Sequence, residues 1–229
     1  FWKNLMSKEL KFRILTSIFL FLLVLFCIFT NKYISIIALT VISSIAWMEF
    51  NKLIIKIFYK NNYLRIFLMG LSFLYLVFFV LTSLAIIESS KFYFIYILLI
   101  CIFSDIGGYI IGKSFGGKKL TKLSPNKTIS GSIGSFLFST FPVFALYLLF
   151  IFNDVQGLII NNNNFFHNIL LCLSLSLICQ LGDIFISYFK RLAKVKDTGN
   201  ILPGHGGILD RIDGIIFAIP GLILFFIII

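Results

Sequence analysis

The sequence predicts an all-α, polytopic integral membrane protein with about seven transmembrane helices (range about six to eight) in a single domain, residues 1–229. Three observations support this fold class. The chain is 59% hydrophobic and 13% charged, against about 45–50% and about 25% in soluble domains. Its apolar residues form long runs, and its glycines and acids gather in two segments. This composition excludes soluble globular, fibrous and disordered proteins.

The first four apolar runs span residues 12–30, 33–51, 66–87 and 92–112. Each has about the twenty residues that a helix needs to cross the hydrocarbon core. Only Asn31 and Lys32 separate the first two runs, so we expect a very tight hairpin there. The fourth run contains Asp105, about two turns before its end.

The last three apolar runs span residues 133–153, 168–189 and 212–229. A polar patch, Asn161 to Asn164, predicts a loop between the fifth and sixth runs. The sixth run carries Asp183, and the seventh follows a glycine-rich turn. Both acids lie inside otherwise apolar segments, which marks them for closer attention.

The basic residues alternate from one side of the predicted membrane to the other. Eighteen Lys and Arg fall in the N-terminal segment and every second loop, and two fall in the other loops. The positive-inside rule then predicts a cytoplasmic N-terminus and places loops 113–132 and 190–211 together on the cytoplasmic face. The net charge of +11 is explained in this way, so we expect no nucleic-acid partner.

Two segments, 92–132 and 180–214, are predicted to carry a functional site at the cytoplasmic face. Thirteen of the 16 glycines and five of the nine acids lie in or beside these segments. Glycine permits close approach of the backbone to a ligand. In a chain otherwise built of Phe, Ile and Leu, these are the places where we expect a polar group to bind.

In the first segment, Asp105, Gly108, Tyr109 and Gly112 fall on one helix face. A carboxylate in a spanning helix is costly and usually marks a functional site. The alternative is that Asp105 pairs with a lysine and serves helix packing. The loop that follows is rich in lysine and glycine but lacks the P-loop spacing.

In the second segment, Gln180, Asp183, Ser187 and Lys190 form a polar stripe on one helix. Asp183 lies at about the depth of Asp105, and two such acids can share Mg²⁺ with phosphate oxygens. The alternative is that Asp183 is a buried acid satisfied by Lys190 or by a neighbouring helix.

The second segment also resembles a known family. The residues Ser187-Tyr-Phe-Lys-Arg, Lys196-Asp197, Pro203-Gly-His-Gly-Gly and Asp210-Arg-Ile-Asp resemble the signature of the phosphatidate cytidylyltransferase (CDP-diacylglycerol synthase) family, without a mismatch over 27 positions. The stretch from Ser104 to Gly131 is similar to that family too. Trp47, Glu49 and Phe50 resemble a weaker landmark. One departure is Ser130, which stands where the family usually has Glu.

The resemblance implies transfer of CMP from CTP to phosphatidic acid, a membrane lipid, to give CDP-diacylglycerol and pyrophosphate. It implies Mg²⁺ as cofactor, one ion or two, and a homodimer. It also implies an integral protein of the bacterial cytoplasmic (inner) membrane whose active site faces the cytoplasm. If the family's Glu contacts a metal or the nucleotide, another group replaces it where Ser130 stands.

The site residues expected for this reaction fall into three sets. The predicted catalytic residues are Asp183, Lys190, Arg191, Asp210, Arg211 and Asp213. The predicted substrate-binding residues are Asp105, Tyr109, Lys113, Lys127, Ser187, Lys196, Asp197, His205, Gly206 and Gly207. The predicted metal ligands are Asp183, Asp105 and Asp213.

Two other functions fit parts of the sequence. A CTP-dependent polyprenol kinase would need the same nucleotide but would transfer its γ-phosphate. An ion-coupled transporter would use the intramembrane acids for a coupling ion. The sequence has no visible inverted repeat, and its polar residues gather at one face, which favours an enzyme over a transporter.

Overall fold

The computed structural model of the protein describes residues 8–121, 127–145, 165–201 and 206–228. In these ranges the regular structure is helical, apart from isolated β-bridge residues, which include the bridge between Lys119 and Thr128. The all-α prediction is confirmed. The helices are α1 (Lys8–Thr30), α2 (Lys32–Ile57), α3 (Asn62–Ser89), α4 (Lys91–Phe115), α5 (Ile129–Ser139), α7 (Phe165–Leu192), α8 (Leu209–Ile212) and α9 (Ile215–Ile228).

Four helices, α2, α3, α4 and α7, are long and apolar enough to cross a membrane, and the chain is an integral membrane protein. Two further apolar helical segments, Phe19–Thr30 and Ile129–Ala145, are shorter. Part of the predicted fifth run, residues 146–153, lies outside the described ranges. The total number of crossings and the orientation of the N-terminus stay predictions.

The first hairpin is as tight as the sequence predicts. Asn31 alone separates α1 from α2, and its side chain accepts a hydrogen bond from the backbone N–H of Tyr33. Across the turn, the hydroxyl of Ser35 donates to the carbonyl of Cys27 at 2.8 Å. These contacts satisfy polar groups at helix ends, which otherwise have no intrahelical partner.

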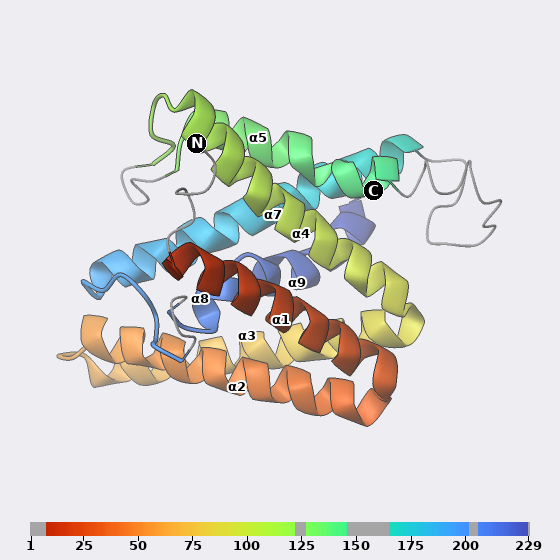
Figure 1. Cartoon of the computed structure of the whole chain (residues 1–229). Helices are drawn as coiled ribbons and strands as arrows, with labels where there is room; N and C mark the ends of the chain where they lie inside the picture. The colour runs from red at the N-terminus through yellow and green to blue at the C-terminus, as the bar shows by residue number, and fades with distance from the viewer. Residues whose placement is uncertain (1–7, 122–126, 146–164, 202–205, 229) are drawn as a thin grey trace.

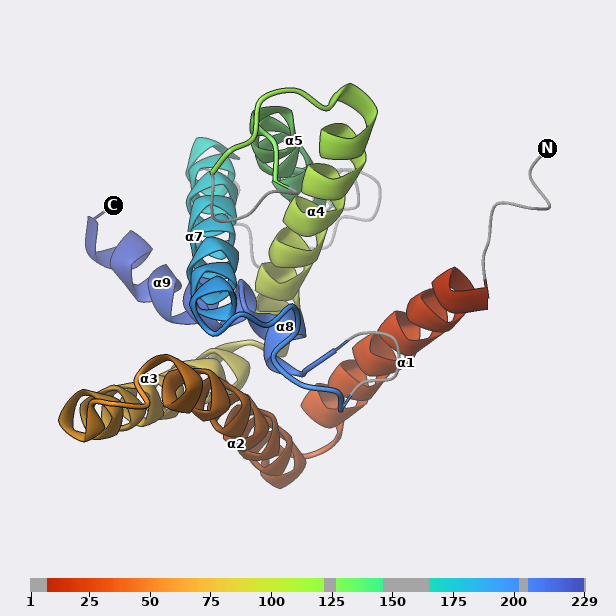
Figure 2. The ribbon, with the colours of Figure 1, turned by 90° about the vertical axis from the view of Figure 1, so that its left-hand side faces the viewer.

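The helices form two groups (Figures 1 and 2). One group is the α2–α3 pair, and the other contains α4, α5 and α7. Helix α9 packs between the groups, against α7 and α3. Buried apolar side chains fill the centre of the bundle, among them Ile97, Ile100, Leu171, Leu175 and Ile219.

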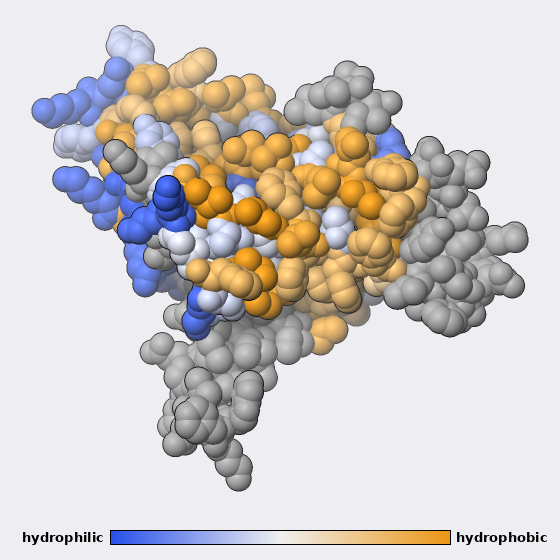
Figure 3. All heavy atoms as spheres, turned by 90° about the horizontal axis from the view of Figure 1, so that it is seen from above, coloured by the Kyte–Doolittle hydropathy of each residue, from blue (hydrophilic) through white to orange (hydrophobic). Residues whose placement is uncertain are grey.

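Three connections lie at the same end of the bundle, on the left in Figure 1: the α2–α3 turn, the α4–α5 loop and the chain after α7. The described parts of the two basic loops that the sequence assigns to one face therefore lie at the same end of the bundle. Figure 3 shows hydrophilic residues at this end and a mainly hydrophobic surface over the rest of the face in view. We call this end the polar end.

Glycines allow α4 and α5 to cross closely. A Cβ atom on Gly107 would lie 2.4 Å from the carbonyl oxygen of Gly134 and from Cβ of Phe138, and one on Gly131 would lie 2.8 Å from the carbonyl oxygen of Gly108. Small residues permit such backbone contact between helices in a membrane. Several glycines of the first segment thus serve helix packing, where the sequence suggested close approach to a ligand.

Helix α9 begins at Ile215, three residues later than the predicted run. The chain turns at Asp213 and Gly214, where a Cβ on Gly214 would lie 2.3 Å from the sulfur of Cys179 in α7. Further along, α9 contains Pro220, which has no backbone N–H to donate to the carbonyl of Ile216. The hydroxyl of Tyr75 in α3 donates to that carbonyl at 3.2 Å.

Candidate functional site

Three predicted metal ligands come together at the polar end. Asp105 of α4, Asp183 of α7 and Asp213, between α8 and α9, lie close enough for their charges to act on one another. Asp105 is exposed, and Asp183 and Asp213 are half-buried. Three acids from separate elements repel one another, so this arrangement favours cationic partners.

Lys127 supplies one such charge, because its ammonium group forms an ion pair with the Oδ2 atom of Asp183. The α4–α5 loop places this lysine: Leu120 donates its backbone N–H to the carbonyl of Lys127 at 2.8 Å, next to the isolated bridge. Thr128 then caps α5 by accepting from the N–H of Gly131. Asp183 is half-buried and its lysine partner is Lys127 of the α4–α5 loop, whereas Lys190 pairs with Asp210.

The other oxygen of Asp183, Oδ1, accepts a hydrogen bond from Ser187 one helical turn later, at 3.3 Å. The positive charge of Arg211, in α8, interacts electrostatically with Asp105. The predicted residues Lys127, Ser187 and Arg211 thus all lie around the three acids. This cluster of three carboxylates with Lys127 and Arg211 is called the carboxylate cluster below.

A chain of polar side chains lies beside the carboxylate cluster. Ser104 of α4 and Ser176 of α7 are hydrogen-bonded at 2.8 Å, Gln180 donates to Ser176 at 3.3 Å, and Ser132 of α5 donates to Gln180 at 2.5 Å. Polar groups away from water need such partners. These hydrogen bonds link α4, α5 and α7 and so hold together the two helices that carry Asp105 and Asp183.

Lys190 and Asp210, both predicted to be catalytic, form a mostly buried ion pair at 2.7 Å. Asp210 also accepts hydrogen bonds from the backbone N–H groups of Thr198, at 2.8 Å, and Gly207, at 3.0 Å. Burial acts to raise the pKa of Asp210, but the bonds from Lys190, Thr198 and Gly207 and the charge of Lys190 outweigh it and lower the pKa below its usual range. The oxygens of Asp210 are therefore used within the chain.

Glu49 of α2 is a central residue of this end, although the sequence indicated it only as part of a weak landmark. Its side chain is buried, and its carboxylate accepts hydrogen bonds from the hydroxyl of Thr198 and the backbone N–H groups of Ile208 and Leu209. A single acid near the end of an apolar run was the only available signal, because its partners lie far away in the sequence.

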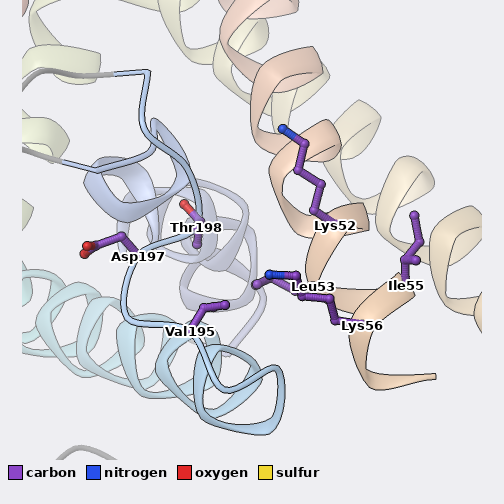
Figure 4. A pocket seen from close by; sticks show the side chains of 7 residues that line it. All are labelled: Lys52, Leu53, Ile55, Lys56, Val195, Asp197 and Thr198. Carbon is purple, nitrogen blue, oxygen red and sulfur yellow. The ribbon is translucent and has the colours of Figure 1, made fainter. Parts of the chain in front are cut away.

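A pocket of about 280 Å³ opens between α2 and the chain after α7 (Figure 4). Residues 52, 53, 55 and 56 of α2 line one side, and residues 195, 197 and 198 line the other. Its lining includes two lysines, Lys52 and Lys56, and the carboxylate residue Asp197. The predicted substrate-binding residue Asp197 thus lies at a cavity next to Thr198.

Other predicted residues lie at the surface. Arg191, Lys196 and Asp197 are exposed. Tyr109 and Lys113 contact each other on an exposed face of α4, with the lysine nitrogen 5.5 Å from the ring centre. Gly206 has a positive φ of 83° and packs beside Asp197 and Asp210, which suits glycine. His205 lies outside the described residues.

The carboxylate cluster offers oxygen donors to a divalent metal. In the parts of the chain that the structure describes, no three His, Cys, Asp or Glu side chains form a ready-made metal site. Magnesium rarely uses such a site, since it binds through one or two carboxylates, water and substrate phosphates. The oxygen donors of the carboxylate cluster fit that chemistry. Ser130, at the position of the family's Glu, instead donates to the carbonyl of Gly116.

Comparison with known proteins assigns the chain to a family. Residues 53–229 match the model of the "Cytidylyltransferase family". Proteins named phosphatidate cytidylyltransferase are similar: one from Bacillus subtilis (strain 168) is 44% identical over 129 residues, covering 56% of this chain and 45% of that protein. One from Rickettsia bellii (strain RML369-C) is 46% identical over 127 residues, covering 54% and 52%.

A third relative of that name, from Staphylococcus haemolyticus (strain JCSC1435), is 43% identical over 129 residues, covering 56% of this chain and 46% of the relative. The chain spans about half the length of the curated relatives it matches. The family match covers well over half of the chain and includes the whole carboxylate cluster. The chain therefore belongs to the cytidylyltransferase family.

Proposed function

We propose that this protein transfers CMP from CTP to phosphatidic acid, giving CDP-diacylglycerol and pyrophosphate for phospholipid synthesis. The observation that carries the proposal is the carboxylate cluster with its lysine and arginine at the polar end of a membrane protein of this family. An oxygen of the lipid phosphate attacks the α-phosphorus of CTP. The bond from that phosphorus to the bridging oxygen breaks, and pyrophosphate leaves with the electron pair.

The reaction needs little general-base catalysis. A phosphate monoester has a second pKa of about 6 and is mostly ionised near neutral pH. The protein's contribution is then to position the reactants and to neutralise their charge. Lys127 and Arg211 lie beside the acids and are suited to contact phosphate oxygens. Lys190 is already paired with Asp210, so its charge acts on the substrates from a distance and not through direct contact.

Cytidylyltransferases generally use a divalent metal. We infer that Asp183, Asp105 and Asp213 would bind Mg²⁺ here, as one ion or as two. The metal would supply positive charge beside the triphosphate. These three residues stand on different elements, so their placement depends on the contacts between α4, α7 and α9.

The substrates also suggest where the site faces. The polar end carries the basic loops, and positive loops favour the cytoplasmic side. CTP is a cytoplasmic nucleotide, and the headgroup of phosphatidic acid lies at the depth of the carboxylate cluster if α4 and α7 cross the bilayer. We therefore propose a bacterial cytoplasmic membrane with the site facing inwards.

The proposal is tested with labelled CTP, purified protein, phosphatidic acid and Mg²⁺. We expect radioactive CDP-diacylglycerol from the wild type and at least about a hundredfold lower kcat for Asp183→Asn, because a preorganised charge at the reacting phosphates is lost. Chelation of Mg²⁺ with EDTA should abolish the reaction.

The matched control is Glu88→Gln, which also turns an ion-paired acid into an amide. Glu88 pairs with Lys32 at 2.5 Å and is exposed at the other end of the bundle. It should keep wild-type activity. Full activity of Asp183→Asn would contradict the proposed role. Label transferred from the γ-phosphate to a prenol, without CDP-diacylglycerol, would establish the kinase in place of the cytidylyltransferase.

A further inference from the structure

We propose that Glu49 is a positioning residue: its buried carboxylate fixes the chain after α7 against α2 and thereby places the substrate-binding residues of that chain. The inference deepens the proposed function and depends on it for the link to catalysis. Glu49 lies outside the residues that match the family, since the match begins at residue 53. We call residues 195–201 and 206–209 the signature loop.

The hydrogen bonds of Glu49 all lead to the signature loop. Its Oε2 atom accepts from the hydroxyl of Thr198 and from the backbone N–H of Leu209, each at 2.9 Å. Its Oε1 atom accepts from the N–H of Ile208 at 3.2 Å. These partners lie 149 to 160 residues further along the chain. Both ends of the loop are therefore bound to one side chain of α2.

The loop backbone also closes around this carboxylate. A Cβ atom on Gly199 would lie 2.4 Å from Oε1 of Glu49, and one on Gly207 would lie 2.3 Å from Oε2. Glycine is required for this approach because any side chain would collide with the oxygens. Glu49 itself is only 1% exposed. It is enclosed by protein and has no surface to offer a substrate, so its effect must pass through the loop.

Thr198 joins Glu49 to the buried ion pair. Its hydroxyl lies 2.9 Å from Glu49 and 3.0 Å from Oδ2 of Asp210, and its N–H donates to the same Asp210 oxygen. Asp210 in turn binds Lys190 of α7. Two buried carboxylates with these shared donors thus connect α2, the loop, α8 and α7. Buried charged groups are costly, and their best-supported benefit is one defined arrangement of the chain.

Thr198, which Glu49 holds in place, is next to the residues of the signature loop that are accessible to a ligand. Lys196 and Asp197 precede Thr198 directly and are exposed. Asp197 and Thr198 line the pocket of Figure 4 opposite Lys52 and Lys56 of α2. Release of Thr198 from Glu49 would let these side chains move relative to α2. We therefore expect loss of nucleotide affinity without loss of the fold.

The first test is hydrogen–deuterium exchange of the purified full chain in detergent, read by mass spectrometry. In Glu49→Gln, exchange in peptides of the signature loop should rise at least about tenfold, because hydrogen bonds to a charged acceptor are lost. Peptides of α3 should not change, nor should the loop in Glu88→Gln. Unchanged loop exchange in Glu49→Gln would overturn the proposal.

If exchange rises over the whole chain of Glu49→Gln, the variant Thr198→Val is used to decide whether Thr198 is held by its hydroxyl contact. This change keeps the carboxylate, its bonds to Ile208 and Leu209 and the N–H bond of residue 198 to Asp210, but it removes the hydroxyl that contacts Glu49 and Asp210. Faster exchange confined to residues 195–201 supports the proposal, and wild-type exchange there overturns it. These readouts need no enzymatic activity, so they remain valid if CDP-diacylglycerol synthesis fails.

The second test separates positioning from simple loss of folded protein. In the CTP assay, Glu49→Gln should raise the KM for CTP about tenfold and change kcat less, which corresponds to the loss of one good hydrogen bond to a charged group. Fewer folded molecules would lower apparent kcat and leave KM unchanged, and that result would overturn the proposal. Glu49→Ala should raise KM further, since the amide of Gln can still accept one bond.

Discussion

Asp183 and Asp210 each contact one lysine, but they differ in exposure and in their other hydrogen-bond partners. The side chain of Asp210 is about 7% exposed, and its Oδ2 atom accepts hydrogen bonds from Thr198 and Gly207 as well. Asp183 is about 29% exposed, and besides Lys127 its side chain contacts the hydroxyl of Ser187 and the carboxyl group of Asp213. The carboxylate that can still accept a ligand is therefore Asp183. The contacts of Asp210 suit a residue that holds the loop.

The Lys190–Asp210 pair predicts a dependence of stability on pH. Because the pKa of folded Asp210 lies below its unfolded value of about 3.9, its stabilising contribution is complete above that value and is lost as the pH falls through the folded pKa. Thermal unfolding in detergent between about pH 7 and pH 3 measures this.

The variant Asp210→Asn should lose about 1–3 kcal/mol of stability at neutral pH, because the mostly buried ammonium group of Lys190 loses its charged partner. It should also show a weaker fall of Tm in acid than the wild type. Glu88→Gln, at an exposed ion pair, serves as the control and should behave like the wild type. An equal acid dependence in Asp210→Asn and the wild type would contradict the assignment.

At the level of helices, sequence reasoning worked where the signal was periodic and local. Apolar runs predicted the helices, and the depth of Asp105 and Asp183 in two runs predicted that they meet. Sequence reasoning could not assign the contacts of Glu49, because no local pattern shows partners 149 to 160 residues away. Nor could it tell that Gly107 and Gly134 pack helices, since the same residues also suit a binding site.

The α4–α5 crossing predicts a contrast between two glycines. Gly107→Ala should destabilise the protein by about 1–3 kcal/mol, because its Cβ would lie 2.4 Å from Gly134 and Phe138. Gly70→Ala in α3 is the matched control: no atom lies within 4 Å of the added Cβ, and alanine favours a helix by about 0.5–1 kcal/mol. Unfolding in mixed micelles measures both, and equal effects would refute the packing argument.

For the whole molecule, the polar end gathers loops that the sequence places on one side of the membrane. That agreement follows from helix lengths, since each spanning helix returns the chain to the opposite end. The direction of insertion and the homodimer stay predictions. Insertion is governed by basic loops and the cellular machinery, and neither is a property of the folded contacts.

Insertion is tested by labelling single cysteines in bacterial spheroplasts. Cys101, Cys172 and Cys179 are buried, and half-buried Cys27 is first replaced by Ser. Lys60→Cys, in the α2–α3 turn, should react with a membrane-impermeant maleimide only after lysis. Ser89→Cys, at the other end of α3, should react in intact spheroplasts. The reverse pattern would place the carboxylate cluster outside the cell and exclude access to cytoplasmic CTP.

Pro220 and Tyr75 belong to different helices, yet we expect the residue types at these two positions to be selected together. The proline removes the donor for the carbonyl of Ile216, and the tyrosine hydroxyl replaces it. An unpaired carbonyl in lipid is costly, so a lineage that keeps the proline has reason to keep a hydroxyl at residue 75. Once residue 220 regains an N–H, that reason disappears. The two positions should therefore vary together among descendants of this chain.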